Sequence, residues 1–384
     1  MISAVFVFHS FTPCLPFWSP YDTSPQTAMT SFPATSASPT SALAKPKVLV
    51  SILNWNGAGK TLHCLASIKD EQASTSALAD VSVLVLDNGS RSDDCAALQA
   101  AIPAFVSLKC LPVNLGFTGG HNIAITSAIA EGYDFIWLLN NDAEVVPGTL
   151  LKLVQEIMRD AKTGAVSPVL RDSADRSTVV RCVNTHNWTD WESNRITAFD
   201  EAQRLQDTEP TSVWLDGTAI LFRVAALAQT GPLDDRLFAY YDDDDIGTRL
   251  ARHGWHSRCV FSATVYHDVR QTFEEYPPYL VYLLQRNHLL FYYKHTPAPY
   301  RRKLYLRLVD KAFFEANRRC DRGLPEQGDM MLLAIEDFIR GRFGPPMMNR
   351  KVAWWLRATA KISAKLNREK LDSLRPVSAA INVD

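Results

Sequence analysis

Four consecutive aspartates, Asp242 to Asp245, form the densest run of ionisable side chains in the sequence. They lie in the stretch FAYYDDDDIGTRL, between two tyrosines and an apolar, helix-like segment. A helix start explains part of this cluster, because Asp242 or Asp243 can cap the helix and Asp245 can pair with Arg249 one turn later. A carboxylate left beside other negative charge has a raised pKa and is a better base. We therefore expect a general base for a hydroxyl group here.

Asp142 is a second candidate, because it follows the apolar run FIWLL with Asn140 two positions earlier. A carboxylate and a carboxamide at this spacing can bind a hard divalent cation and a sugar hydroxyl. Mg²⁺ and Mn²⁺ prefer such oxygen ligands and keep positions open for phosphate oxygens, so the ion would neutralise a diphosphate leaving group. The alternative is a simple turn, and the residues alone leave both interpretations open.

Two further residues have weaker signals. Asp87 begins the sequence DNGS, which either forms a turn that caps the next helix or offers a carboxylate to a pyrimidine N3–H or a ribose hydroxyl. His267 precedes Asp268, and a single histidine is more often structural than functional. We expect His267 to matter only if it faces Asp142.

The elements that must position these side chains alternate between apolar strands and helices. The predicted strands span residues 47–53, 81–86, 106–111, 134–139 and 164–170. Near-continuous apolar strands that alternate with helices predict a parallel sheet covered on both faces. Polar or small residues follow four of these strands, and ligands of open α/β sheets bind beyond the carboxyl ends of the strands. We therefore predict a binding site at this edge.

The third strand is followed by GFTGG, which we interpret as a small-residue loop before a helix that starts at His121. Such a loop can approach a phosphate closely. It is neither a P-loop nor G-x-G-x-x-G, which argues against P-loop NTPases and dinucleotide dehydrogenases. Later in the chain, residues 213–224 and 256–267 are predicted strands, and the chain is mostly helical from about Tyr276 onward.

Taken in order, these stretches resemble the family 2 inverting glycosyltransferases, particularly their rhamnosyltransferase-like branch, from about Val48 to Lys294. The segments that resemble family motifs are VSILNWNG, VLVLDNGS, NLGFTGGHNIAI, WLLNNDAEVVPGTL and FAYYDDDDIGTRLARHGW. The resemblance implies a GT-A fold, which is a Rossmann-like α/β domain with a mostly parallel sheet flanked by helices, here followed by a helical C-terminal extension. It also implies a nucleoside-diphosphate sugar donor and Mg²⁺ or Mn²⁺.

The resemblance also implies residue roles. Asp243 falls on the catalytic base, and Asp242 stands where glutamate is usual, so the two could exchange roles. Asp142 falls on the metal ligand, and His267 lies near a position that often completes the metal site. The expected nucleotide-sugar-binding residues are Leu53, Trp55, Asn56, Asp87, Asn114, Gly116, Asn140 and Asn141. The expected acceptor-side residues are Trp214, Asp216, Gly217 and Asp245. Arg286 and Asn287 match a recurrent Arg-Asn pair to which the sequence assigns no role.

Composition excludes several other classes. The net charge of −1 provides no field that would attract nucleic acid. The seven cysteines are scattered without a C-x-x-C pair, which argues against a disulfide framework or a zinc ribbon and favours a reducing cytosol. The sequence contains no run of about 18 apolar residues, so we expect no membrane-spanning helix.

We predict three regions from these patterns. Residues 1–46 are rich in Ser, Thr, Ala and Pro and are expected to be disordered, with Met29 as an alternative start. Residues 47–272 are the expected GT-A catalytic domain, with a nucleotide-sugar-binding half (47–170) and an acceptor-binding half (171–272). Residues 273–384 are the expected helical C-terminal region.

A basic segment lies within this last region. Residues 349–370 contain seven basic residues and one acidic residue, with apolar residues at helical spacing and the pair Trp354-Trp355. This pattern predicts either an amphipathic helix on an anionic membrane or a helix packed on the protein with a solvated basic face.

The expected function is transfer of a sugar, with dTDP-L-rhamnose favoured over UDP-sugars as donor, to a glycan or lipid-linked acceptor in cell-surface polysaccharide synthesis. The expected location is the cytoplasm, with peripheral contact at the inner face of the membrane. Two alternatives remain. One is a nucleotide-sugar-binding scaffold without turnover. The other is a sugar nucleotidyltransferase, although NWNGAGK lacks the Gly-rich loop with Arg and Lys that such enzymes need.

Overall fold

The computed structural model describes residues 45–188, 191–268 and 276–372, without the side chains of 303 and 367–372. The segment predicted to be disordered, 1–46, therefore lies outside the described residues except for its last two positions. The domain boundaries that we placed at residues 170 and 272 stay predictions.

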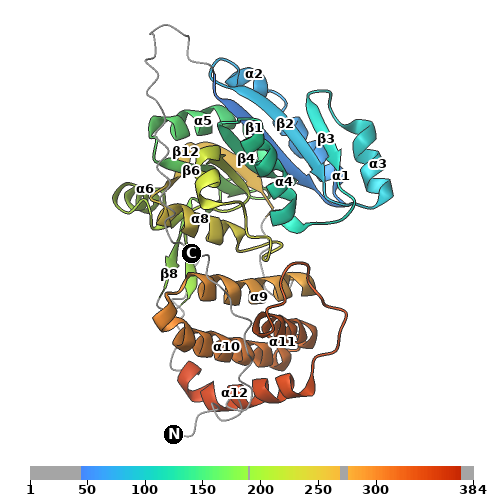
Figure 1. Cartoon of the computed structure of the whole chain (residues 1–384), viewed down its shortest axis with the longest axis vertical. Coiled ribbons are helices and arrows are strands. Elements are labelled where there is room, and N and C mark those ends of the chain that lie inside the picture. The colour runs from blue at the N-terminus through green and yellow to red at the C-terminus, as the bar shows by residue number, and fades with distance from the viewer. Residues whose placement is uncertain (1–44, 189–190, 269–275, 373–384) are drawn as a thin grey trace, which may run out of the picture.

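The first half of the chain builds the parallel part of a large sheet (Figure 1), in the strand order β3-β2-β1-β4. Its strands are β1 (Lys47–Asn54), β2 (Asp80–Asp87), β3 (Val106–Cys110) and β4 (Phe135–Asn140). Adjacent residues Ile136 and Trp137 point to opposite faces of β4, yet both are fully buried. The sheet is thus covered on both faces, as the apolar strands predicted.

The rest of the sheet contains strands of mixed direction, in the order β4-β11-β6-β12-β5. Strand β11 (Ala219–Arg223) runs antiparallel to β4 and to β6 (Thr163–Asp172), while β12 (His256–His267) runs parallel to β6. Two short strands, β5 (Glu144–Val145) and β7 (Val179–Arg181), pair at the margins. The result is an α/β fold whose sheet is wholly parallel from β3 to β4 and mixed from β4 to β5.

The single strand predicted over residues 213–224 is wrong. Its first part is β10 (Val213–Trp214), which joins β8 (Val183–Asn187) and β9 (Glu192–Ile196) in a separate three-stranded sheet. The chain then turns through residues 215–218 before β11 enters the main sheet. This break places the small and polar residues of the turn in a loop, where they are available to a site.

Helices cover the two faces of the main sheet. One face packs against α1 (Ala58–Ser67), α3 (Ser92–Ala101) and α5 (Thr149–Arg159), and the short α2 (Glu71–Thr75) lies beside α5. The other face packs against α4 (Gly116–Ala130), α6 (Phe199–Thr208), α7 (Val224–Thr230) and α8 (Asp242–Arg252). Helix α4 starts at Gly116 rather than at His121, so the residues predicted as a loop form its first turn.

The C-terminal part of the described chain is helical, as predicted, and has its own apolar core (Figure 1). It contains α9 (Pro278–His295), α10 (Ala298–Asp321), α11 (Pro325–Ile339) and α12 (Trp354–Asp372). Proline begins or nearly begins three of these helices, which suits its fixed φ and missing N–H. Within the described residues, none of the helices is long and apolar enough to cross a membrane.

Candidate active site

The carboxyl end of β1 meets that of β2 in a buried polar network. Asn54, paired in register with Asp87, donates from its amide nitrogen to Asp87 Oδ1 (2.8 Å) and to Asp94 Oδ2 (2.9 Å). Its amide oxygen accepts from Thr61 Oγ1 (2.7 Å). These bonds orient the Asp87 carboxylate before any ligand arrives. Neither Thr61 nor Asp94 was predicted as a site residue. For Asp94, the helix dipole explains an acidic residue in the first turn of a helix equally well.

Trp55 and Asn56 lie in the loop above this network. The Asn56 side chain accepts from the backbone N–H of Arg91 (2.8 Å), and the Asn56 N–H donates to Ser90 Oγ (2.9 Å). The loop is thereby tied to the turn that follows Asp87. The Trp55 ring remains 53% exposed at the sheet edge, which leaves an aromatic face available to a planar base.

The turn before α4 connects the same edge to the aspartate cluster. Asn114 Oδ1 accepts from the N–H of Gly116 (2.7 Å) and from Asn88 Nδ2 (3.1 Å). Gly116 has φ +75°, and a Cβ at this position would lie 2.3 Å from the carbonyl oxygen of Phe238. Only glycine fits this close approach. Further along α4, Gly120 packs against Leu53.

Asp142 and His267 do face each other, which is the condition that the sequence analysis set. Asp142 Oδ1 lies 3.1 Å from His267 Nε2, and Asn140 Nδ2 lies 3.5 Å from the same nitrogen. Burial alone would raise the pKa of Asp142, but His267 and Lys60 together hold that pKa below its usual value. Lys60 Nζ lies 3.6 Å from Asp142 Oδ2, so the carboxylate already attracts a cation. Asn141 instead donates to Thr61 Oγ1 (3.0 Å), behind this pair.

These donors suit a hard divalent cation, because they combine a carboxylate oxygen, an imidazole nitrogen and an adjacent carboxamide. A different cluster is denser. Among the described residues, Asp87, Cys95 and Cys110 form the group of metal-capable side chains whose ligand atoms lie within 4.8 Å of one another. Two of its three ligands are thiols, which favour softer metals than Mg²⁺. The chemistry of the donors therefore favours Asp142 and His267 for Mg²⁺ or Mn²⁺.

The turn between β10 and β11 supplies the residues expected on the acceptor side. Asp216 Oδ2 accepts from Arg181 Nε (3.0 Å), and its other oxygen accepts from Thr218 Oγ1 (2.6 Å). Trp214, at the end of β10, is buried and stacks on His186 with ring centroids 5.2 Å apart. The turn is thus held rigidly, and it presents the N–H of Gly217 to the aspartate cluster.

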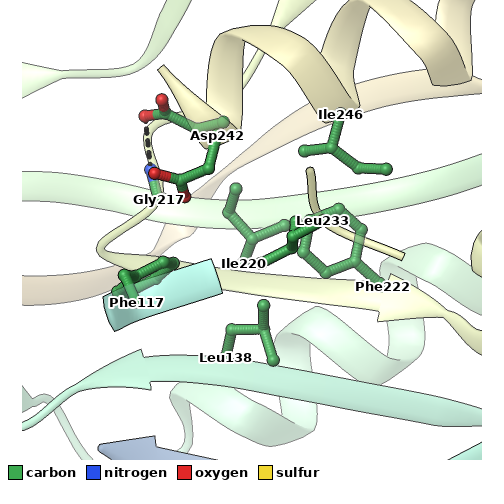
Figure 2. Close-up of a pocket in the computed structure, with 9 residues that line it drawn as sticks. Phe117, Leu138, Gly217, Ile220, Phe222, Leu233, Asp242 and Ile246 are labelled. Atoms are coloured by element: carbon green, nitrogen blue, oxygen red, sulfur yellow. Dashed lines mark hydrogen bonds between the residues drawn. The ribbon is translucent and has the colours of Figure 1, made fainter. Parts of the chain in front are cut away.

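Asp243 receives that N–H. Gly217 donates to Asp243 Oδ2 (2.9 Å; dashed line in Figure 2), and the backbone N–H of Asp244 donates to the other oxygen (3.0 Å). Burial, followed by the negative charge of Asp216, raises the pKa of Asp243 to about 6. A raised pKa was expected, but its main cause is burial rather than crowding by the neighbouring aspartates. A carboxyl group with this pKa is a competent general base near neutral pH.

The two neighbouring aspartates are more deeply buried. Asp242 borders a small apolar pocket with Leu138, Ile220, Phe222 and other residues of the sheet and α4 (Figure 2). Burial, reinforced by the charge of Asp243, raises the pKa of Asp242 and of Asp244 well above the usual value. Both therefore favour the protonated form, and Asp243 is the residue of the three that ionises most readily.

Asp245 has a different environment from the one expected. Its carboxylate contacts Arg249 Nε (2.9 Å), Lys294 Nζ (2.6 Å) and His295 Nε2 (2.7 Å). The hydrogen bond with His295 and the charges of Arg249 and Lys294 hold its pKa far below normal despite burial. The predicted pair with Arg249 is confirmed. However, the carboxylate joins α8 to α9 rather than facing the Gly217 turn, so its expected acceptor-side position is wrong.

The predicted capping of α8 by an aspartate is also wrong. Tyr241 occupies the N-cap position with φ +66°, and no side chain among the described residues caps it. Phe238 and Tyr240 also have positive φ values, of 65° and 69°. Positive φ is uncommon for residues other than glycine, and each such residue costs about 1–3 kcal/mol. The loop that leads to Asp243 is therefore strained.

Arg286 and Asn287 hold this strained loop. Both are fully buried in α9. Asn287 Nδ2 donates to the carbonyls of Leu237 (2.8 Å), Ala239 (2.8 Å) and Tyr240 (3.0 Å). Arg286 donates to the carbonyl of Leu237 (3.2 Å) and, further away, to that of Gly344 (2.7 Å). The Arg-Asn pair, which had no role at the level of sequence, thus braces the backbone directly before the aspartates.

Comparison with known proteins shows the family of the chain. A sequence model of the glycosyltransferase-like family 2 matches residues 46–286. The chain belongs to this family. The matched part of this family 2 protein contains all the candidate site residues predicted from the sequence, and it ends at the arginine of the Arg-Asn pair.

Two relatives of this family 2 protein come from Mycobacterium tuberculosis. An N-acetylglucosaminyl-diphospho-decaprenol L-rhamnosyltransferase is 31% identical over 208 residues, which cover 49% of this chain and 66% of that protein. Galactofuranosyltransferase GlfT1 is 26% identical over 190 residues, which cover 50% of this chain and 61% of that protein. The match thus spans slightly less than two thirds of the length of either relative.

A solved structure resembles the fold of this family 2 protein. S. aureus TarS (residues 1–349, in complex with UDP-GlcNAc) superimposes with a TM-score of 0.52 at 14% identity, covering 85% of this chain and 92% of that chain. At this identity the likeness concerns the fold alone. The GT-A fold expected from the sequence is confirmed.

Proposed function

We propose that the protein is an inverting glycosyltransferase that moves a sugar from a nucleoside-diphosphate donor to an acceptor hydroxyl. The observation that carries the proposal is the environment of Asp243. Its carboxylate is held by two backbone N–H groups and has a pKa of about 6. A second carboxylate, Asp87, ends β2 in the same fold and is oriented by a hydrogen bond from Asn54 at the end of β1.

In the proposed reaction, Asp243 accepts the proton of the acceptor hydroxyl. That oxygen attacks the anomeric carbon on the side opposite the diphosphate, so the anomeric configuration inverts in one step. The transition state has oxocarbenium character, as in glycoside hydrolysis. The N–H groups of Gly217 and Asp244 keep the carboxylate oriented towards the acceptor. Asp242, which favours its protonated form, adds little negative charge to repel the donor.

Asp142 and His267 would hold a divalent cation, with Asn140 beside them. Mg²⁺ or Mn²⁺ bound there would neutralise the negative charge that develops on the departing diphosphate. The ammonium group of Lys60 lies against the Asp142 carboxylate. Because the Lys60 side chain is exposed, it can move away from Asp142 or turn towards a phosphate of the donor.

For the donor, we favour dTDP-L-rhamnose, with UDP-sugars next. In this proposal, Asp87 accepts from the N3–H of a pyrimidine or from a ribose hydroxyl, and the ring of Trp55 stacks on the base. The support for rhamnose is the family branch that the sequence resembles and the rhamnosyltransferase activity for which the 31% identical relative is named. The name of that relative also describes a lipid-linked acceptor, and we propose the same acceptor class here, reached from the cytoplasmic side of the membrane.

The test is the thermal stability of the full chain against a panel of nucleotide sugars, with and without Mg²⁺ or Mn²⁺. We expect dTDP-L-rhamnose at about 100 times its Kd to raise Tm by about 5 °C with metal present, because ligand binding stabilises the native state by mass action. Asp142→Asn should lose the metal-dependent part of the shift. Asp160→Asn, at an exposed carboxylate on the far side of α5, should keep it.

Other outcomes would contradict the proposal. If none of the nucleotide sugars raised Tm, the donor assignment would be wrong. Binding without release of nucleoside diphosphate to any acceptor would indicate a scaffold, and release of pyrophosphate would indicate a nucleotidyltransferase.

A further inference from the structure

Helix α12 has two distinct faces. Leu356, Ala360, Ser363 and Ala364 are buried, and the spacing of these residues describes one side of an α-helix. This side packs on α10, where Ser363 Oγ donates to Asp310 Oδ1 (2.6 Å). Only this side of α12 contributes to the apolar core of the C-terminal helices.

The opposite half is exposed and carries a repeated pattern. Trp354, Lys361, Ile362 and Lys365 lie at positions i, i+7, i+8 and i+11, which also share one side of the helix. We call these four residues the outer face of α12. Trp354 is 81% exposed and Ile362 is 48% exposed, so two large apolar side chains lie in water between basic ones. A purely solvated basic face would not need them.

No side chain that the structure describes forms an ion pair with the basic residues of this face. No acidic residue occurs between Lys351 and Leu366. Arg357, at the side of the helix, is already paired with Asp329 (2.6 Å). Lys361 and Lys365 have no ion-pair partner among the residues that the structure describes. Their ammonium groups are free to bind an external anion.

The position of α12 leaves this face accessible. The helix lies at the end of the molecule farthest from strands β1–β3, with α10 between it and α9 (Figure 1). Its buried side faces α10, so its outer face points away from the rest of the protein. A flat surface could approach there without contacting the catalytic sheet.

We propose that the outer face of α12 docks this protein on an anionic lipid bilayer. Trp354 and Ile362 enter the headgroup region, where an amphipathic indole is favoured, and Lys361 and Lys365 contact lipid phosphates. A second copy of the chain is a poorer occupant, because two such faces would bring like charges together. The inference rests on α12 alone, so it does not depend on the proposed reaction.

The experiment is flotation of the full chain with vesicles of phosphatidylcholine, alone or mixed with phosphatidylglycerol. We expect binding to the mixed vesicles that weakens as salt is raised. The variant Trp354→Ser/Lys361→Glu/Lys365→Glu should bind about tenfold less or weaker still. The control is Met158→Ser/Lys69→Glu/Lys162→Glu, which makes matched changes at exposed positions of the catalytic part and should float like the unchanged protein.

All altered side chains are exposed, so we expect each variant to fold. The melting temperature of each variant checks this. Equal flotation of the α12 variant and the control would overturn the proposal. Binding that does not require phosphatidylglycerol would also overturn it. A concentration-dependent dimer that the α12 variant alone abolishes would assign the face to a second copy instead. Donor binding, measured on the same samples, reports separately on the proposed reaction.

Discussion

At the scale of single residues, the function depends on which of four adjacent carboxyl groups carries a charge. Asp245 is held ionised by a hydrogen bond with His295 and by the charges of Arg249 and Lys294, whereas Asp242 and Asp244 favour their protonated forms. Asp243 lies between these extremes, with a pKa of about 6. Environment, rather than residue type, thus distinguishes four identical side chains.

Replacing Asp243 by Asn should separate activity from stability. Turnover should fall by about 10²–10⁴-fold, because the general base is lost. Stability should rise at about pH 8, by about 3 kcal/mol at most, because the native state no longer contains a buried carboxylate that resists ionisation.

The sign follows from the two pKa values. The folded pKa of Asp243 (about 6) lies above the unfolded value of 3.8, so its contribution to stability is complete below pH 3.8 and is lost as the pH rises through 6. Thermal melts of both proteins across this range measure the effect. A variant that melts lower than the unchanged protein at about pH 8 would contradict the raised pKa. Near-normal turnover would remove Asp243 as the base.

Sequence patterns predicted part of this residue-scale arrangement. The roles expected for Asp142 and His267 required them to meet, and they do, because Asp142 lies in the turn between β4 and β5, and β5 pairs with the end of β12 that carries His267. The bracing of Asp245 by Lys294 and His295 could not be predicted, since the partners lie about 50 positions apart and no local spacing reports such contacts. For the same reason, Arg286 and Asn287 could be recognised as a motif but not interpreted.

At the scale of elements, α9 controls the loop that precedes α8. Three residues of this loop, Phe238, Tyr240 and Tyr241, have left-handed backbone conformations. They persist because Asn287 supplies both of its amide hydrogens to the carbonyls around them. The local sequence predicted a helix start at the aspartates, but the tertiary hydrogen bonds decide the cap.

The change Asn287→Asp keeps the side-chain shape but removes the donors. We expect a loss of about 2–3 kcal/mol in the free energy of unfolding, because buried carbonyls lose their partners and face a carboxylate. We also expect kcat to fall about tenfold while donor affinity is retained, because a small displacement of a catalytic group lowers rate more than binding.

The matched control for this change is Asn317→Asp, at a partly buried position of α10 whose side-chain amide donates to Asp321 in the same helix. Denaturant unfolding and single-turnover kinetics measure the two effects. If Asn287→Asp and Asn317→Asp behave alike, Asn287 does not position the loop.

At the scale of the whole molecule, the catalytic sheet and the C-terminal helices are joined through α9. The catalytic sheet has cores on both faces, and the C-terminal helices surround a third. Leu237 of the catalytic loop is buried in that third core. The two parts therefore share residues as well as hydrogen bonds, and we expect them to unfold together.

The change Phe313→Ala, within the C-terminal core, tests this coupling. Phe313 is 2% exposed, and its truncation should lower the free energy of unfolding by about 3–5 kcal/mol. Because the parts are joined, one transition should move to lower temperature, seen equally by circular dichroism and by the thiol reactivity of Cys64 in the catalytic core. Phe199→Ala, at a 39% exposed site, is the control. Two separate transitions, with Cys64 unaffected, would contradict the coupling.

The bracing of the catalytic loop from Arg286, Asn287 and Gly344 has a consequence for biosynthesis. A nascent chain that has left the ribosome as far as residue 286 contains every strand of the main sheet, yet it lacks Asn287 and the Gly344 turn that hold the loop. Domains fold largely in the order in which they are synthesised. The geometry around Asp243 is thus completed only after residue 344 has been synthesised, and shorter nascent chains lack an assembled base.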